Sequence, residues 1–181
     1  MTPAPSPKPR IAPAEGDPEG LLPLNIFRTM SKHRGLADRF NRFGGYLLLK
    51  GLIPAREREL VILRVGWRCG SVYEFGQHTL MSQPAGVTED EIARAATESL
   101  EGWATGDRDL MAFVDELCAT NTVSDQAWER VAGRWSEEQM IELLLLAGFY
   151  RLVSGFLNSV RVELDPGVPG WPEGREPGSA G

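Results

Sequence analysis

The sequence predicts an all-α protein, a compact bundle of roughly six to eight helices with extended Pro-rich termini. Three observations support this fold class. Helix-capping patterns recur along the chain, apolar residues follow the helical period in several segments, and no segment shows the alternation expected of a strand. Connections between the predicted helices are short, which is typical of a bundle.

The first helices follow a proline-rich arm. Residues 1–23 contain seven prolines and no apolar run, so we expect an extended arm rather than a signal peptide or a membrane span. Asn25 is expected to cap a short helix over residues 26–33. A second helix is predicted over residues 36–49, interrupted at residues 44–45, which are both glycine.

A buried helix is predicted next. Pro54 suits the first turn of a helix, since its missing N–H would be unpaired there anyway, and the apolar run over residues 60–65 indicates burial on most sides. Ser71 and Glu74 then have the spacing of a capping box. We therefore expect another helix to begin at Ser71 and to end before residue 84.

The remaining helices are predicted by further caps and by periodicity. Thr88 with Glu91 and Ser136 with Gln139 repeat the capping-box spacing, and the expected helices cover residues 88–100, 107–119, 124–131 and 137–160. The apolar run over residues 143–150 is far shorter than the ~20 residues that span a bilayer, so it indicates a buried helix. Residues 165–181 contain four prolines and five glycines and are expected to form a tail. The predicted units are thus an arm (1–23), a helical domain (24–164) and a tail (165–181).

Composition excludes some classes of function. The 181 residues carry a net charge of −6, with Lys and Arg scattered along the chain, which disfavours a nucleic-acid partner. Two cysteines do not make a disulfide framework, so a reducing, cytoplasmic location is expected. No zinc-ligand spacing and no phosphate-binding loop is present, so no metal and no cofactor is expected.

The segment around residues 69–78 holds the most reactive combination of side chains. Cys69 is expected just before a helix N-terminus, where the dipole favours the thiolate, although a buried cysteine is equally a small apolar residue. Glu74 and His78 are four residues apart and share a helix face. A carboxylate beside an imidazole favours proton transfer near neutral pH. The capping box alone accounts for Glu74, whereas nothing structural accounts for His78.

Other candidates flank this segment. Glu57 opens the preceding helix, where a carboxylate also suits the helix dipole. Arg64 is a charge within an apolar stretch, so we expect it to pair with Glu57 or to hold a substrate carboxylate. Trp67 and Tyr73 either pack in the core or line a pocket. Cys118 lies on the apolar side of its predicted helix and is expected in the core.

Three stretches of this sequence resemble the carboxymuconolactone decarboxylase family, which also contains alkylhydroperoxidase D. They are Arg-Glu-Arg-Glu-Leu-Val-Ile-Leu-Arg-Val from residue 56, Trp-Arg-Cys-Gly-Ser from residue 67, and Tyr-Glu-Phe-Gly-Gln-His from residue 73. The resemblance implies a helical bundle of the alkylhydroperoxidase D type that forms trimers or hexamers, a dimer being the alternative. It also implies an active site near a subunit contact.

The resemblance also assigns roles by position. In the alkylhydroperoxidase branch, a Cys-x-x-Cys-x-x-x-His signature and an upstream glutamate carry the redox chemistry. Cys69 matches the first cysteine and Glu57 the glutamate, whereas the second cysteine is replaced by Val72 and the histidine by Gly76. His78 matches a second histidine that some members carry. A neighbouring thiol normally resolves the sulfenic acid, and Val72 lacks one.

We therefore expect a cofactor-free acid–base enzyme, a decarboxylase, isomerase or related lyase, acting on a small organic acid, lactone or enolisable carbonyl compound. In this hypothesis His78 moves the proton, Glu74 orients it, and Glu57 and Cys69 line the pocket. One alternative is a thiol peroxidase or disulfide reductase that uses Cys69, resolved by Cys118 or by an external thiol. The other is a small-molecule-binding subunit without turnover. The expected partners are a small-molecule substrate and further copies of the chain, with no nucleic acid and no membrane.

Overall fold

The computed structural model describes residues 8–178, and every regular element within them is helical. This confirms the predicted all-α fold. In chain order the elements are α1 (Asn25–Met30), the 3₁₀ turn η1 (Ser31–His33), α2 (Arg34–Leu49), α3 (Ala55–Arg68), α4 (Val72–Ser82), α5 (Glu89–Ala95), α6 (Thr105–Thr120), α7 (Asp125–Ala132) and α8 (Glu137–Val160).

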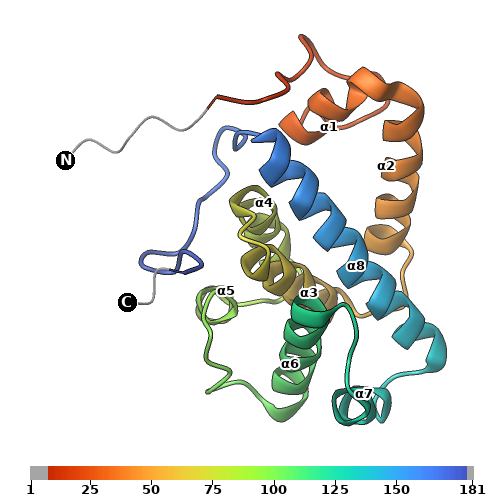
Figure 1. Cartoon of the computed structure of the whole chain (residues 1–181), viewed down its shortest axis with the longest axis vertical. Coiled ribbons are helices and arrows are strands. Elements are labelled where there is room, and N and C mark those ends of the chain that lie inside the picture. Colours follow the sequence, from red (N-terminus) through yellow and green to blue (C-terminus); the bar gives the residue numbers. More distant parts are fainter. Residues whose placement is uncertain (1–7, 179–181) are drawn as a thin grey trace.

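Helix α3 lies at the centre of the bundle and contacts α4, α5, α6 and α8 (Figure 1). Its apolar run explains this position, because every residue from Glu59 to Trp67 is buried. Helices α1 and α2 lie on the other side of α8 from α3 and α4, and α5, α6 and α7 form the opposite end of the molecule. A central helix that touches most others can place side chains from several elements around one site.

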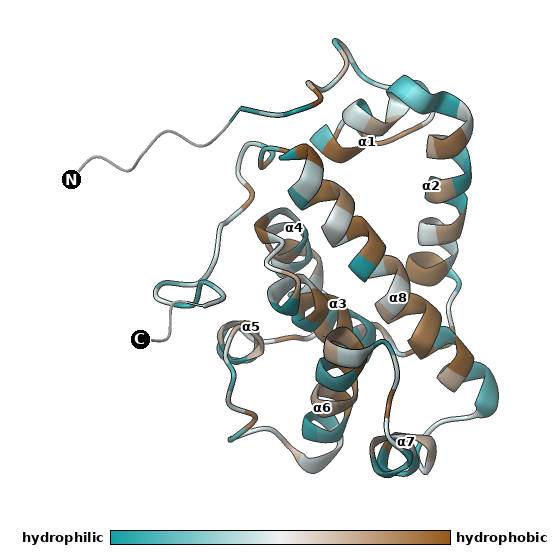
Figure 2. Cartoon of the chain, viewed as in Figure 1, coloured by the Kyte–Doolittle hydropathy of each residue, from teal (hydrophilic) through white to brown (hydrophobic). Residues whose placement is uncertain are grey.

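Helix α8 is the longest element and is apolar over most of its length (Figure 2). Its 24 residues are long and apolar enough to cross a membrane by length and composition, yet half of its most apolar window is buried within the protein. The residues that α8 buries include Leu143, Ala147 and Tyr150, which belong to the main core. Helix α8 is therefore a core helix of this bundle, as the sequence predicts.

The capping patterns are confirmed at two helices and wrong at a third. Thr88 with Glu91 and Ser136 with Gln139 form complete capping boxes at the starts of α5 and α8. Ser71 occupies the N-cap of α4, but its buried hydroxyl makes no capping hydrogen bond. The Glu74 carboxylate instead turns toward His78, so its capping role in the sequence interpretation is corrected.

Helix α2 runs without a break through its two glycines, contrary to the interruption expected there. Gly44 is buried and faces the Phe149 ring on α8, and a Cβ at this position would lie 3.1 Å from that ring. Phe149 also packs against Phe40, one turn earlier in α2, with ring centroids 4.8 Å apart. Gly44 thus allows a close approach of α2 and α8 rather than ending the helix.

The segment that follows α8 folds back onto α4. The Asp165 carboxylate accepts hydrogen bonds from Asn25 N–H and from Gln77 Nε2, and Tyr73 donates its hydroxyl proton to it. Trp171 packs against Phe75, with ring centroids 5.0 Å apart. Residues 165–175, expected as part of a tail, therefore form a layer of the fold.

Gly76 is the position on α4 that this layer covers. A Cβ at Gly76 would collide with the Pro169 carbonyl oxygen and with the Val168 side chain. No side chain fits there while the C-terminal segment holds its place. The position that carries the histidine in the Cys-x-x-Cys-x-x-x-His signature is thus structurally closed in this chain.

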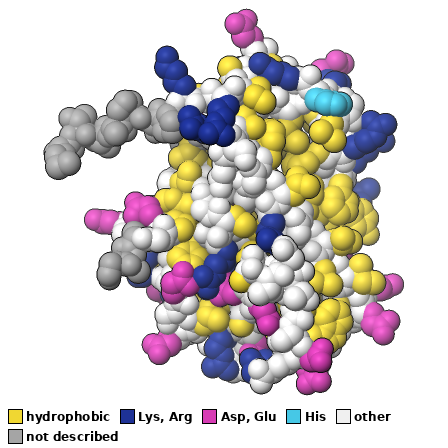
Figure 3. All heavy atoms as spheres, in the orientation of Figure 1, with side chains coloured by type: hydrophobic (Ala, Val, Ile, Leu, Met, Phe, Trp, Pro, Cys, Tyr) yellow, Lys and Arg dark blue, Asp and Glu magenta, His cyan; other side chains and the backbone are white. Residues whose placement is uncertain are grey.

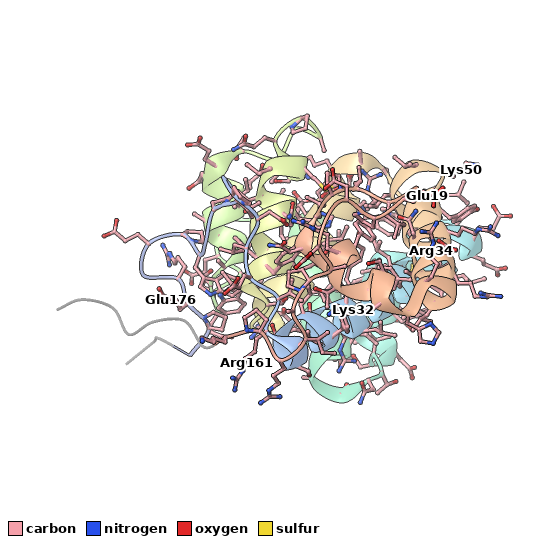
Figure 4. The ribbon with its side chains drawn as sticks, turned by 90° about the horizontal axis from the view of Figure 1, so that it is seen from above. Glu19, Lys32, Arg34, Lys50, Arg161 and Glu176 are labelled. Carbon is pink, nitrogen blue, oxygen red and sulfur yellow. The ribbon has the colours of Figure 1, made fainter. Side chains whose placement is uncertain are left out.

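The parts of the predicted arm and tail at residues 1–7 and 179–181 lie outside the described residues. Within the described part of the arm, Arg10 N–H donates to the Val160 carbonyl and Ala14 N–H donates to the Arg28 carbonyl. In the view from above, labelled charged side chains such as Arg34, Lys50 and Arg161 lie on the outside of the bundle (Figure 4). These labelled charges lie at the periphery, whereas Glu59, Arg64 and Glu74 are buried.

Candidate active site

A cavity of about 330 Å³ opens between α1, α2, α3, α4 and α8. Its walls are mostly apolar, and the apolar side chains come from α1, α2, α4 and α8: Ile26, Phe27, Phe40, Leu48, Met81, Phe149 and Val153. Arg58, Glu74, His78 and Tyr150 form one polar part of the wall, and Asn41 and Gln77 add two amide groups to the lining. An apolar cavity with a few convergent polar groups has the form of a small-molecule site.

Four charged side chains form a continuous chain along that wall. Arg58 donates from Nε and Nη2 to Glu59 Oε1, at 3.1 and 3.0 Å. The second oxygen of Glu59 lies 2.6 Å from His78 Nδ1. On the far side of the ring, His78 Nε2 lies 3.2 Å from Glu74 Oε1. The imidazole is thus held between two carboxylates, with Glu59 behind it and Glu74 at the cavity.

Local sequence explains how these groups meet. Glu74 and His78 are one turn apart on α4, and therefore share a face. Glu59 lies at the start of the buried run of α3, the helix with which α4 makes its most extensive contact. The Glu59 and His78 side chains are 1% and 4% exposed, so water cannot solvate their charges. Each charge is instead stabilised by the opposite charge of the other side chain.

The surroundings hold His78 in its charged form. Burial opposes the imidazolium, but the hydrogen bonds and charges of Glu59 and Glu74 outweigh it and raise the pKa of His78 to about 9. Burial likewise favours neutral Glu59, yet the hydrogen bond and charge of His78, with the charge of Arg58, lower the pKa of Glu59 below its usual value. At neutral pH the site therefore presents an imidazolium between carboxylates.

Tyr150 completes the polar wall. Its ring meets the His78 ring edge-on, with centroids 5.1 Å apart and planes at 88°. Burial and the negative charges of Glu74 and Glu59 raise the pKa of Tyr150 well above its usual value. The hydroxyl therefore stays protonated near neutrality and can donate a hydrogen bond into the cavity.

Tyr73, predicted to bind substrate, also lines the cavity. Its hydroxyl, however, already accepts a hydrogen bond from Ile26 N–H at 3.2 Å and donates to Asp165. Tyr73 therefore fixes α1 and the C-terminal segment against α4 and contributes its ring to the cavity wall.

Glu57 and Arg64 do not line the cavity, which corrects the roles predicted for both. Glu57 lies in the first turn of α3, and the carboxylate that reaches His78 is that of Glu59. Arg64 is fully buried on the opposite side of α3, where Nε and Nη2 each lie 2.6 Å from an oxygen of Asp115. Its predicted pairing with Glu57 is wrong. It cannot hold a substrate carboxylate in this cavity.

Trp67 and Cys69 are likewise placed outside the cavity. Trp67 packs in a separate cluster with Phe75, and its Nε1 donates to the Arg175 carbonyl at 2.9 Å. Cys69 follows the last residue of α3 as its C-cap, and Cys69 and Cys118 are both half-buried and pack against the main core. The thiol and the imidazole, close in sequence, therefore do not share a site.

Sequence reasoning missed Arg58, Glu59 and Tyr150. The signal for Glu59 was its place directly before the run over residues 60–65, since a carboxylate that enters a buried run needs a partner. Tyr150 offered a similar signal, as a hydroxyl at the end of the apolar run of α8. Within residues 8–178, no group of three or more His, Cys, Asp or Glu side chains has a metal-binding arrangement.

Known proteins share the fold of this chain, and a known family shares part of its sequence. Residues 34–106 match the model of the Carboxymuconolactone decarboxylase family. No curated protein sequence matches the chain.

Several solved structures share the fold. An alkylhydroperoxidase AhpD core protein from Ralstonia eutropha JMP134, described as peroxidase-related, matches with a TM-score of 0.72 and 17% identity over 80% of this chain and 78% of that one. A putative antioxidant defence protein AhpD from Agrobacterium tumefaciens matches with a TM-score of 0.68 and 20% identity, over 75% and 94% of the two chains.

The debrominase Bmp8, solved as a variant in complex with 2,3,4-tribromopyrrole, matches with a TM-score of 0.69 and 16% identity, over 80% of this chain and 79% of that one. At these identities the matches establish the fold and not the reaction.

The matched motif region contains α3 and α4, the two helices that supply Glu59, Glu74 and His78. Residues 34–106 of this chain are thus similar to the carboxymuconolactone decarboxylase family, and the chain has the alkylhydroperoxidase D-like fold.

Proposed function

We propose that the protein is an acid–base enzyme of the decarboxylase or isomerase type, in which protonated His78 is the general acid. The observation that carries this proposal is the buried imidazole held between Glu59 and Glu74 at the wall of an apolar cavity. Glu59 fixes the ring through Nδ1, as the carboxylate of a catalytic triad does, and leaves Nε2 on the side of Glu74 and the cavity.

The proton transfers follow from this arrangement. When an enolisable substrate loses carbon dioxide, the electron pair of the broken C–C bond moves into the adjacent carbonyl group, and an enolate forms. His78 Nε2–H then delivers a proton to the enolate carbon, and the imidazole regains a proton from solvent. In an isomerisation, Glu74 removes the proton and His78 returns one at another carbon. Tyr150 hydrogen-bonds the enolate oxygen in both cases.

The cavity also indicates the class of substrate. Its volume of about 330 Å³ suits a small molecule, and most of its wall is apolar. Arg58 contributes the guanidinium that the sequence interpretation sought in Arg64, since it lines the cavity while pairing with Glu59. A small carboxylic acid with an apolar body fits these features. The tribromopyrrole complex of Bmp8 supports the view that this fold can accept a small apolar ring.

The proposal is tested with a panel of small 3-oxo acids and unsaturated lactones in D₂O, followed by NMR for deuterium incorporation and carbon dioxide release. The wild-type protein should accelerate exchange or decarboxylation of at least one compound. His78→Gln should lose about 10²–10⁴-fold of that rate. His33→Gln is the matched control, because His33, the other histidine of the chain, lies exposed at the start of α2. Equal rates in His78→Gln and wild type, or no accelerated compound at all, would contradict the proposal.

A second candidate is a small-molecule-binding subunit without turnover. It is favoured by the partners of His78, because both ring nitrogens already face carboxylates and the ring is buried. The open cavity beside the ring favours the enzyme instead. Calorimetry separates the two: a compound that binds wild type and His78→Gln equally and is turned over by neither supports the binding subunit.

The surface supports the proposal that the chain forms a homo-oligomer, with a trimer or hexamer expected from the family. Apolar side chains gather on the side where α2 and α8 lie (Figure 3). Exposed members of this patch include Leu36, Phe43, Leu145 and Leu152, which is 61% exposed. Phe40 and Phe149 line both this patch and the cavity, so a partner seated there would lie near the site. Light scattering that shows a monomer at micromolar concentration would contradict this assembly.

A further inference from the structure

Asn41 is an amide in the cavity wall that the fold leaves without a partner. It lies on α2 and, with Gln77 of α4, supplies the two amide side chains of the lining. Gln77 Nε2 donates to Asp165 at 2.8 Å, so that amide already helps to hold the C-terminal segment. The Asn41 side chain is half-buried and makes no hydrogen bond to any residue within 8–178. Its donors and its acceptor are therefore free for a ligand.

Gly45 follows Asn41 by about one helical turn on the same face of α2, and it also lines the cavity. Side chains of a helix lean toward its N-terminus, so a larger residue at position 45 would reach back over the turn that carries Asn41. A Cβ at Gly45 would meet open space, with no atom of another helix within 4 Å. Glycine at this position thus keeps space open beside the Asn41 amide.

The two neighbouring glycines of α2 have different explanations. Gly44 is needed for packing, since a Cβ there would lie 3.1 Å from the Phe149 ring. No such contact with the described residues accounts for Gly45, although glycine inside a helix costs about 1 kcal/mol relative to alanine. A destabilising residue that packing does not require, in the wall of a cavity, indicates a functional reason for the open space.

Asn41 reaches the cavity from a different wall than the acid–base groups. Helix α2 packs against α1 and α8, whereas Arg58 comes from α3 and His78 from α4. A ligand that engages Arg58 and His78 with one end can therefore contact Asn41 with another part. The amide carries no charge and can both donate and accept, which suits a neutral oxygen such as that of a hydroxyl or a ketone. A hydrocarbon at that place would leave the amide unpaired in an apolar surrounding.

We propose that Asn41 and Gly45 form a second polar subsite of the cavity, which binds a neutral hydroxyl or ketone oxygen of the substrate. This subsite rests on the proposed function, in which Arg58 holds a carboxylate and His78 protonates the reacting carbon. The substrate is then a small hydroxy or oxo carboxylic acid whose second oxygen lies apart from the reacting group. Asn41 selects this class over analogues that lack the oxygen, because only the oxygenated ligand pairs with its amide.

Calorimetry with matched pairs of carboxylates tests the subsite and needs no turnover. The pairs are 4-hydroxyphenylacetate with 4-methylphenylacetate, 5-hydroxypentanoate with hexanoate, and 4-oxopentanoate with 4-methylpentanoate, in which a methyl group replaces the oxygen. We expect the full-length wild-type protein to bind the oxygenated member of at least one pair about tenfold more tightly, and Asn41→Leu to bind both members of that pair equally. No binding, no preference in any pair, or a preference that Asn41→Leu retains would overturn the proposal.

Gly45→Leu tests the space beside Asn41. The leucine should cover the amide and abolish the preference for the oxygenated ligand, whereas the unfolding free energy should not fall, because leucine is a better helix former than glycine. Gly155→Leu on α8 is the matched control, since a Cβ there also meets open space and Gly155 lies outside the cavity. Equal ligand preference in Gly45→Leu and Gly155→Leu would contradict the role of Gly45.

Binding and turnover together separate this subsite from the proposed reaction. A preference that depends on Asn41, in a protein that turns over no compound of the D₂O panel, supports the subsite and contradicts the proposed function. Turnover that depends on His78, with oxygenated and methyl analogues bound equally, supports the reaction and contradicts the subsite.

Discussion

Glu59 Oε2 lies 2.6 Å from His78 Nδ1, and both side chains are almost completely buried. This contact joins α3 to α4 and decides which nitrogen of the imidazole faces the cavity. Without it, His78 would be a buried ring with a single carboxylate, Glu74, from its own helix. Because Glu59 adds a second negative charge, the imidazole stays protonated in a place where burial alone would neutralise it.

The first prediction concerns the pH dependence of catalysis. A general acid must carry its proton, and the pKa of His78 is raised to about 9. We therefore expect kcat/KM to be constant around neutrality and to fall about tenfold per pH unit above that pKa. The measurement is a pH–rate profile on any compound that the wild-type protein turns over. A rate that rises through the same range would instead show that neutral His78 acts as the base.

Glu59→Gln should move the falling limb of that profile. The substitution keeps the shape of the side chain but removes the charge that favours the imidazolium, so the limb should shift by about 1–3 pH units toward lower pH. Glu57→Gln is the matched control, because Glu57 lies on the same helix outside the cavity. Equal profiles for the two variants would show that Glu59 does not set the charge of His78.

The ion pair between Arg64 and Asp115 is expected to support stability rather than catalysis. Asp115→Asn leaves the fully buried Arg64 guanidinium without its counter-charge, so unfolding free energy should fall by about 3–5 kcal/mol. Burial alone would raise the pKa of Asp115, but the guanidinium groups of Arg68 and Arg64 outweigh it and lower this pKa below its usual value. The contribution of the carboxylate is therefore present above its usual pKa and is lost as pH falls.

Urea denaturation measures this effect. Asp90→Asn is the control, because Asp90 forms an exposed pair with Arg94 that contributes about 0–1 kcal/mol. A loss in Asp115→Asn no larger than that in Asp90→Asn would contradict the structural role of the pair.

Gly76→Ala tests whether the C-terminal segment is part of the fold. The added Cβ collides with the Pro169 carbonyl oxygen, so the segment must move, at a cost of about 1–3 kcal/mol. Limited proteolysis should then cut after Asp165 more rapidly than in wild type. Gly155→Ala on α8 is the control, because a Cβ there meets open space and should stabilise the helix slightly. Unchanged proteolysis in Gly76→Ala would show that the segment is not docked at this point.

The helices could be predicted from sequence because their signals are local. Thr88 with Glu91 and Ser136 with Gln139 form the capping boxes that their spacing predicts. The same spacing at Ser71 and Glu74 was misleading. On α4, the Glu74 carboxylate reaches a histidine one turn further on, and a three-residue pattern cannot distinguish a cap from such a contact.

The site could be predicted only in part, because it depends on contacts between helices. His78 stands two residues beyond the histidine position of the family signature, and Glu59 stands two residues beyond the glutamate position that Glu57 matches. The pair is displaced together, which positional matching of one residue at a time cannot detect.

The charge of His78 is the most direct test of the central claim, and NMR of the imidazole nitrogens measures it. The chain has two histidines, so His33→Gln assigns the two ring systems. We predict that His78 in the folded protein is an imidazolium at neutral pH, with both nitrogens protonated, and that it titrates with a pKa of about 9. A His78 ring that is neutral at pH 7, with one nitrogen unprotonated, would contradict its role as the general acid held between Glu59 and Glu74.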